Sequence, residues 1–375
     1  MINSIDITGY RSLSRLSLDN LGQINLIVGT NNSGKTSILE AIYLLTSSGD
    51  PSAIWKIITQ RGEQLPPDVT PGKQIQQELD MSHLFYNHKL VSGSYLSIET
   101  NGEVQRSIAF TVSEARREEN PALYAQLPQE NFTSPSFSQL AVTISGTPNP
   151  LAKIIPLSSR GGFRQEIFQL LVNMAANSPR VDESHPQYIS TNSLSLHELV
   201  SIFNSISLTK DEDFVLNALR FIEPDIERIA TAPISPFVFP GSQAKGGFKV
   251  KLKDLDQPIP IGSMGDGIWR MLSLSIALTM ARNSVILLDD IDTGFHHSVM
   301  DKMWKLVFET SKALNVQVFA TTHSNDCVKS LASICNNEDS EHRISLQRIE
   351  PGMSKTIVYN ETEVIISAED NIEVR

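Results

Sequence analysis

One segment of this 375-residue chain has the residue types and the spacing of a phosphate-binding loop. It runs from Gly29 to Thr36 and matches the pattern G-x-x-x-x-G-K-[ST]. In such a loop the glycines allow tight turns, and successive backbone N–H groups form a concave anion site at a helix N-terminus. Lys35 can reach the β and γ phosphates, and the Thr36 hydroxyl can ligate Mg²⁺. The residues predicted to contact the phosphates are Asn31, Asn32, Ser33, Gly34, Lys35, Thr36 and Ser37.

Paired carboxylates follow a second apolar run, Val285 to Leu288. A continuous apolar run suits a parallel strand buried on both faces, and ligands bind at the carboxyl ends of such strands. Beside a phosphate loop, Asp289 is expected to hold Mg²⁺ through water and Asp290 to activate the attacking water. The alternative is an ordinary buried strand that ends in a solvated acidic turn, and the phosphate loop favours the first interpretation.

Thr321-Thr322-His323-Ser324 ends a third apolar run, 316–320, so His323 could reach the γ-phosphate or its water from the same sheet edge. A lone histidine at a strand end is also often structural. A glycine-rich segment, 262–267, precedes an apolar helical pattern over 268–280 and predicts a second anion-binding helix start. One nucleotide needs only one such cradle, so this segment either binds a nucleotide held by another subunit or is a plain helix start.

The elements that must position these residues can be outlined from periodicity. Ile24–Val28 predicts a buried strand and Ser37–Leu45 the helix after the loop, while the segment 5–18 predicts two short antiparallel strands. Tyr10 and Arg11, at the turn between those strands, could stack on an adenine base. Equally, they could be a strand-edge aromatic residue and a solvated arginine.

The middle of the chain predicts a separate layer and a helical insertion. Strand patterns occupy 94–100, 105–112 and 139–144, with a hairpin signal at Asn101-Gly102, and 113–136 reads as a loop. Helical patterns occupy 163–176, 196–207 and 213–222, and strand patterns follow at 226–231, 237–239 and 247–253. Arg160 and Arg164 lie in a loop that could contact phosphates or a partner, or be solvated. We therefore predict an α/β fold with a nucleotide-binding core at 1–50 and 241–375, an antiparallel β layer at 51–150 and a mainly helical lobe at 151–240.

Composition limits the setting of this site. The net charge of −11 argues against a surface that is basic throughout, so DNA or RNA would need a local basic patch. Two cysteines imply no disulfide framework, and the sequence has neither a signal peptide nor an apolar stretch long enough for a membrane span. We expect a cytoplasmic protein with no membrane partner.

The order phosphate loop, glycine-rich segment, paired acids and Thr-Thr-His-Ser resembles an ABC-type AAA ATPase, more narrowly the RecF-like and overcoming-lysogenisation-defect (OLD) branch. The segments 7–12, 28–37 and 289–296 are similar to that branch, and the motifs cover about 1–46 and 258–330. The resemblance implies a P-loop NTPase fold with a mixed central sheet, ATP as substrate and Mg²⁺ as cofactor. It implies Asp290 as catalytic acid, His323 as switch histidine, and a signature of Ser263, Gly265 and Gly267 that acts in trans across a head-to-tail homodimer or higher homo-oligomer.

Two departures from the family bear on activity. The family usually has Glu at the position of Asp290, whose side chain is one methylene shorter, so we expect slow turnover. Counting back from Arg270, the signature serine falls at Met264, next to Ser263, so its register stays open. The sequence identifies no glutamine loop, for which Gln60 is a candidate.

Three functions remain open from the sequence. The first is an ATPase whose ATP-dependent dimer gates a partner, such as a separate nuclease or toxin, in phage defence, toxin–antitoxin systems or DNA metabolism. Members of the OLD branch often carry a C-terminal Toprim nuclease, for which the roughly 50 residues after His323 are too few. The others are a RecF-like DNA-repair clamp and a non-hydrolysing ATP-binding scaffold.

Overall fold

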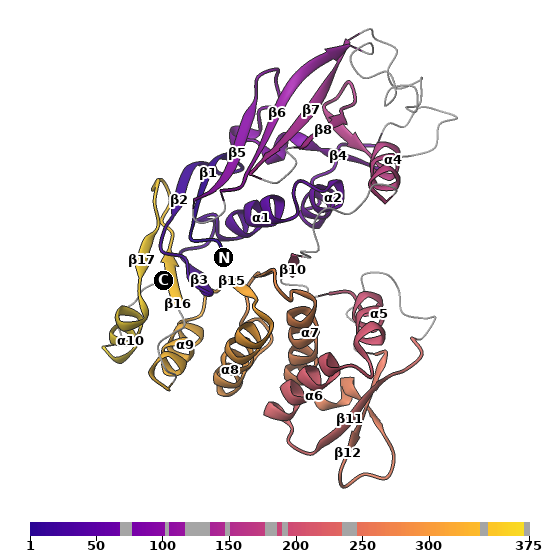
Figure 1. Ribbon diagram of the computed structural model, residues 1–375, viewed down its shortest axis with the longest axis vertical. Helices are drawn as coiled ribbons and strands as arrows, with labels where there is room; N and C mark the ends of the chain where they lie inside the picture. Colours follow the sequence, from indigo (N-terminus) through magenta and orange to yellow (C-terminus); the bar gives the residue numbers. More distant parts are fainter. Residues whose placement is uncertain are drawn as a thin grey trace.

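The computed structural model describes residues 1–67, 77–101, 105–116, 136–146, 151–176, 186–189, 194–234, 246–337 and 344–370. Two six-stranded sheets lie on either side of one helix, α1 (Lys35–Thr46), and further helices cover the far face of the second sheet (Figure 1). The helix α1 contacts strands of both sheets, so the chain folds around it.

The second sheet is mainly parallel and has the order β10-β14-β15-β3-β16-β17, with β17 antiparallel at one edge. Every residue of β3, β14 and β15 is buried, as their continuous apolar runs predict. Val285 and Leu287 face the core on the α1 side, whereas Ile286 and Leu288 face the core on the other side. The strands are β3 (Ile24–Val28), β10 (Gln187–Ile189), β14 (Val285–Leu288), β15 (Gln317–Thr321), β16 (Ile344–Arg348) and β17 (Ile357–Tyr359).

The first sheet is antiparallel and has the order β2-β1-β5-β6-β7-β8. Its strands are β1 (Ser4–Tyr10), β2 (Leu13–Leu18), β5 (Tyr95–Asn101), β6 (Ser107–Arg116), β7 (Ser136–Ser145) and β8 (Leu151–Pro156). The predicted pairing of the first two strands is confirmed. The layer is larger than predicted, because it includes β1, β2 and β8, and because β6 continues to Arg116. Strands β5 and β6 pair antiparallel, and Gly102 of the expected hairpin turn lies outside the described residues.

Helices α7 (Asp266–Met280), α8 (His297–Leu314), α9 (Asn325–Asn337) and α10 (Glu361–Glu369) lie on the far side of the parallel sheet from α1 (Figure 1). A separate small sheet consists of β11 (Ile226–Thr231), β12 (Phe248–Leu252) and β13 (Ile259–Pro260). The expected strand at 237–239 lies outside the described residues.

The predicted helical lobe is divided between two places in the molecule (Figure 1). Helix α4 (Gln165–Ala176) packs on α2 (Pro51–Gln60), where the Phe168 and Trp55 rings stack at 4.5 Å. Helices α5 (Leu196–Ile206) and α6 (Lys210–Ile222) contact α7 instead. Strand β10 belongs to the parallel sheet, because its three residues pair with β14. The three-part division of the chain stays a prediction.

The loop with Arg160 and Arg164 is tied to a buried carboxylate, although Arg160 itself is exposed. Arg160 pairs with the buried Glu78 and donates to the Pro66 carbonyl at 2.8 Å, and Arg164 Nε lies 3.8 Å from Glu78 Oε1. Glu78 belongs to β4 (Glu78–Asp80), which pairs with β9 (Gly162–Arg164). Both arginines therefore hold this ribbon together.

Candidate nucleotide-binding site

Sheet topology brings the separate sequence motifs to one place. Strands β14, β15 and β3 are parallel neighbours, so their carboxyl ends lie side by side at one edge of the sheet. The paired acids follow β14, His323 follows β15, and the phosphate loop follows β3. This edge is where ligands bind in open parallel sheets.

The phosphate loop has the conformation that its glycines allow. Gly29 has a φ of +152°, and a Cβ there would lie 2.4 Å from the Ile349 carbonyl oxygen. Gly34, with a φ of +103°, precedes the first residue of α1. Lys35 Nζ donates to the carbonyls of Gly29 at 2.8 Å and Thr30 at 2.9 Å. Burial lowers the Lys35 pKa, which Asp290 and Asp289 partly oppose.

Asp289 is held by two hydroxyl groups. Thr36 Oγ1 donates to its carboxylate, with distances of 3.1 and 3.0 Å to the two oxygens, and Thr321 Oγ1 donates at 2.7 Å. Thr321 also accepts from the backbone N–H of Asp290 at 2.8 Å. One fully buried threonine thus orients both acids, a role that the sequence did not reveal.

Asp290 and His323 form the second half of the polar cluster. His323 Nε2 lies 3.7 Å from Asp290 Oδ1, and His323 Nδ1 lies 3.3 Å from Lys35 Nζ. A lysine ammonium can only donate, so a neutral His323 ring would accept at Nδ1 and carry its proton on Nε2, toward Asp290. Burial, and then the nearby Asp289, raise the pKa of Asp290. The φ of Asp290 is +49°, a left-handed conformation that aspartate tolerates better than most residues.

The donor set fits Mg²⁺, which prefers oxygen ligands and is usually held by one or two carboxylates plus substrate phosphates. Thr36 and Asp289 would hold it, because their oxygens already lie within hydrogen-bond distance of each other. Within the described residues no group of three or more His, Cys, Asp or Glu side chains could form a metal site from protein ligands alone.

A cleft of about 630 Å³ opens over the phosphate loop. Ser33 Oγ and Arg11 Nη2 are buried in its wall without a hydrogen-bond partner in the described part of the chain, so both suit an oxygen-rich ligand. All the predicted phosphate-loop residues line the cleft except Asn31, which is exposed beside it. The lining also includes residues that the sequence did not indicate: Arg61, Glu63, Tyr86, Asn87 and His88.

Stacking of Tyr10 on a base is ruled out by its burial, because its side chain has no exposed surface. Its hydroxyl donates to Glu40 Oε2 at 3.2 Å, and burial raises the Tyr10 pKa far above its ordinary value. Arg11 is not solvated either, because Glu40 and Glu63 each hold it at 2.6 Å. Arg11 lines the cleft, whereas Tyr10 supports it from beneath. Gln60 is exposed at the end of α2 and is not part of the lining.

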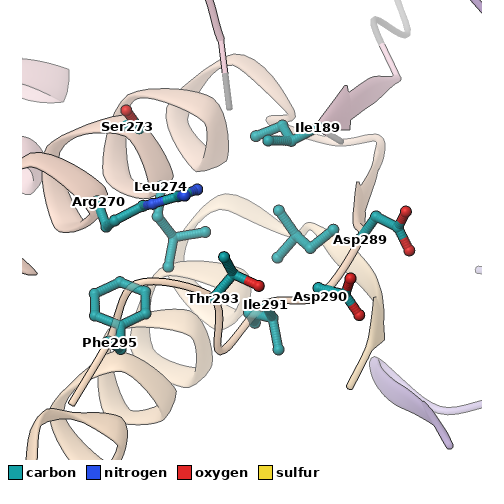
Figure 2. Close-up of a pocket in the computed structure, with 10 residues that line it drawn as sticks. Ile189, Arg270, Ser273, Leu274, Asp289, Asp290, Ile291, Thr293 and Phe295 are labelled. Carbon is teal, nitrogen blue, oxygen red and sulfur yellow. The ribbon is translucent and has the colours of Figure 1, made fainter. Parts of the chain in front are cut away.

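A second, smaller cavity lies behind the two acids, between the end of β14 and helix α7 (Figure 2). Arg270 and Ser273 from α7 and Thr293 from the turn after β14 line it. Its volume of about 40 Å³ has room for at least one water molecule. On its α7 side, Asp290 therefore borders a space that a water molecule can occupy.

The signature residues lie at the start of α7 and do not line the phosphate cleft of their own chain. Ser263 and Gly265 are exposed, and Gly267 is half-buried. Gly265 has a φ of +91° and open space around it. The helix start is therefore accessible to a ligand that another molecule presents.

Comparison with known sequences gives a match to the family described as AAA ATPase domain, over residues 1–93 and 113–328. The chain is 23% identical over 369 residues to an "ATP/GTP phosphatase" of Helicobacter pylori, an alignment that covers 92% of this chain and 91% of the relative. It is 48% identical over 44 residues to the DNA replication and repair protein RecF of Idiomarina loihiensis, 12% of each chain.

Two solved structures resemble the fold over nearly the whole chain. An SMC head bound to the C-winged helix domain of ScpA matches with a TM-score of 0.46 and 15% identity, covering 96% of this chain and 97% of that one. The SMC head domain from Thermotoga maritima matches with a TM-score of 0.45 and 10% identity, covering 96% and 98%. At these scores the likeness carries no functional information.

Proposed function

The chain belongs to the AAA ATPase domain family, and from this premise we propose that it binds MgATP in the cleft over the phosphate loop and hydrolyses it. The observation that carries the proposal is the convergence of Lys35, Thr36, Asp289, Asp290 and His323. These residues come from three strand ends and form one polar cluster with separations of 3.0 to 3.7 Å. The Helicobacter pylori relative is named as an ATP/GTP phosphatase, which supports this chemistry.

Each side chain has a defined task in this proposal. Lys35 binds the β and γ phosphates, and its contacts to the loop carbonyls hold it in place until then. Bound Mg²⁺, held by Thr36 and Asp289, supplies positive charge against the phosphate oxygens. Asp290 accepts the proton of the attacking water, because its raised pKa favours proton uptake over an ordinary aspartate. His323 donates from Nε2 toward the same region.

Phosphate release from ATP by the purified chain tests this proposal. Lys35→Ala is expected to lose most of its MgATP affinity in calorimetry, because the main positive charge against the phosphates is removed. Unchanged affinity would overturn the phosphate-loop assignment. A wild type that binds MgATP without releasing phosphate would instead show a non-hydrolysing scaffold.

The proposal extends to a homodimer that contains two ATP molecules. Each would lie between the Lys35 loop of one subunit and the α7 start of the other, which carries Ser263, Gly265 and Gly267. Support comes from the exposure of that helix start and from its absence from the chain's own cleft. The dimer would gate a partner protein in phage defence, toxin–antitoxin systems or DNA metabolism.

Two free cysteines, Cys327 and Cys335, suit the reducing cytoplasm.

The short match to RecF favours a second candidate, direct binding of DNA. The chain has a local basic surface despite its charge of −11, because Arg228 lies opposite Lys251 in the β11–β12 ribbon and Lys249 is exposed beside them. Binding of duplex DNA that weakens steeply with salt would support this candidate. No binding at 50 mM salt would remove it.

A further inference from the structure

We propose that Tyr86 and His88 form the surface against which the purine base of the bound nucleotide packs. The inference rests on the proposed function, because a base reaches this surface only when its phosphates are held at Lys35. It assigns a binding role to the 3-10 segment η2 (Tyr86–His88), which no sequence pattern indicates.

The position of the segment carries the proposal. The cleft that contains Lys35 and Thr36 extends without interruption to Tyr86 and His88, with about 630 Å³ of space in between. The Tyr86 side chain is 40% exposed. His323, the other ring among the described residues of the lining, already contacts Lys35 at the phosphate end. Tyr86 and His88 therefore provide the aromatic surface left for a base.

The segment is fixed to the first sheet rather than being a free loop. Phe85 is buried and forms an antiparallel bridge with Tyr10. The backbone N–H of Arg11 donates to the Leu84 carbonyl at 3.0 Å, and Arg11 Nη1 donates to the His83 carbonyl at 3.3 Å. Tyr10 thus holds Phe85, the residue before Tyr86, in place, although Tyr10 cannot itself stack on a base.

Local backbone conformation also sets this segment apart. Asn87 and His88 are consecutive non-glycine residues with φ values of +59° and +53°. Such strain persists only where surrounding contacts enforce it, and it occurs often at ligand sites. Here the His88 N–H donates to the Phe85 carbonyl at 3.0 Å, and His88 Nδ1 lies 3.1 Å from His83 Nδ1. The segment is therefore preorganised, which lowers the cost of binding a rigid ring.

Stacking depends on the π face that every base has, so this surface is expected to accept adenine and guanine alike. Removal of one aromatic partner costs at least about five-fold in affinity in comparable sites. Inorganic tripolyphosphate carries the same phosphates without a base, so it separates the base surface from the phosphate loop.

Calorimetry on the full chain with Mg²⁺ and ATP, GTP or tripolyphosphate tests the proposal. Tyr86→Ala is expected to weaken ATP and GTP binding at least about five-fold and to leave tripolyphosphate binding unchanged, and Tyr86→Phe should retain wild-type affinity. Tyr95→Ala is the matched control, because Tyr95 is 51% exposed on β5 outside the cleft. Unchanged ATP affinity in Tyr86→Ala, or equal losses for all three ligands, would overturn the base surface.

The wild type separates this inference from the proposed function. If it binds neither ATP nor tripolyphosphate, the nucleotide site itself is wrong. If it binds both with equal affinity, only the base surface is wrong.

If the Tyr86→Ala protein does not fold, a spectroscopic measurement on a different variant tests the same surface. Tryptophan fluorescence of Tyr86→Trp is expected to be quenched by ATP and GTP but not by tripolyphosphate, and that of Tyr95→Trp by none of them. Quenching by all three ligands, or by none, at position 86 would contradict base stacking.

Discussion

The backbone conformation of Asp290 determines the position of its carboxylate as much as the length of its side chain does. Its N–H is fixed to Thr321, its φ is +49°, and its Oδ1 lies 3.7 Å from His323. Aspartate is tolerated in this left-handed conformation, whereas longer side chains are less common there. The shorter acid is thus matched to the local backbone, and the consequences can be measured in turnover.

Asp290→Asn is expected to slow ATP hydrolysis at least ten-fold, because general-base catalysis contributes roughly 10²–10⁴-fold. ATP affinity should be equal or higher, since one negative charge beside the γ-phosphate is removed. Single-turnover phosphate release and calorimetry measure the two effects. Wild-type turnover in this variant would place the base elsewhere, with Asp292 and His323 the next candidates.

The raised pKa of Asp290 predicts the pH dependence of hydrolysis. A base must be deprotonated to act, so kcat/KM should fall as the pH is lowered through a pKa above the ordinary value of 3.8. Asp290→Asn should lack this acid limb in its residual activity. Circular dichroism at the lowest pH controls for unfolding, and an identical acid limb in the variant would assign the titration to another group.

Thr321→Val tests the residue that orients both acids. It should lower kcat about ten-fold, because Asp289 loses a hydroxyl donor and the Asp290 N–H loses its acceptor at one position. Thr279→Val is the control, since Thr279 is also buried and its hydroxyl donates to the Ile276 carbonyl of its own helix. Both variants should lose comparable stability, and equal turnover in the two would contradict a positioning role.

Elements around the phosphate loop are joined by a buried ion network. Glu40, in the middle of α1, pairs with Arg11 from the β1–β2 turn at 2.6 Å and with Arg61 from the end of α2 at 2.7 Å. Glu40 and Arg11 are only 2% and 5% exposed. Three elements that are distant in the sequence are thus fixed to one carboxylate beneath the cleft.

Glu40→Ala is expected to lower the free energy of unfolding by about 3 kcal/mol, because it breaks a buried ion pair and leaves the Arg11 charge with Glu63 as its remaining carboxylate partner. Denaturant unfolding followed by circular dichroism measures this change. Glu309→Ala is the control, since its pair with Lys305 is exposed, and it should change stability by no more than about 0.5 kcal/mol. Comparable losses in the two variants would show that the network contributes no special stability.

At the scale of the whole molecule, the proposed dimer predicts complementation between inactive chains. Lys35→Ala removes one chain's own phosphate site, and Gly265→Asp places a carboxylate against the partner's γ-phosphate. A mixture of the two should recover part of the wild-type ATPase rate, because the mixed dimer contains one intact composite site. No recovery would argue against a site that is shared in trans.

Light scattering provides the physical readout and the control. Wild type should dimerise with MgATP, and Gly265→Asp should not. Gly93→Asp should dimerise like wild type, because Gly93 also has a φ of +91° and open space around it. A wild type that stays monomeric with saturating ATP would remove the dimer model.

The sequence by itself determined the parts of the site that are contiguous along the chain. The phosphate loop, the acids after Val285–Leu288 and His323 after 316–320 could be predicted as candidates because a motif of adjacent residues fixes its own local geometry. Continuous apolar runs also predicted the three buried parallel strands, since only a strand covered on both faces has no polar side. The order of those motifs was enough to predict the fold class.

Tertiary structure alone decided which side chains meet across long sequence separations. Tyr10 faces the core, and Tyr86 lines the cleft instead. Which face of a strand is exposed depends on how its sheet packs in the folded molecule, and the local sequence pattern does not determine it. Glu78 forms an ion pair with Arg160, which lies 82 residues further along the chain. Strand β10 has only three residues, too few for a periodic signal, and it forms only because the edge of β14 offers backbone partners. These features depend on pairings between distant segments, which the folded chain alone brings together.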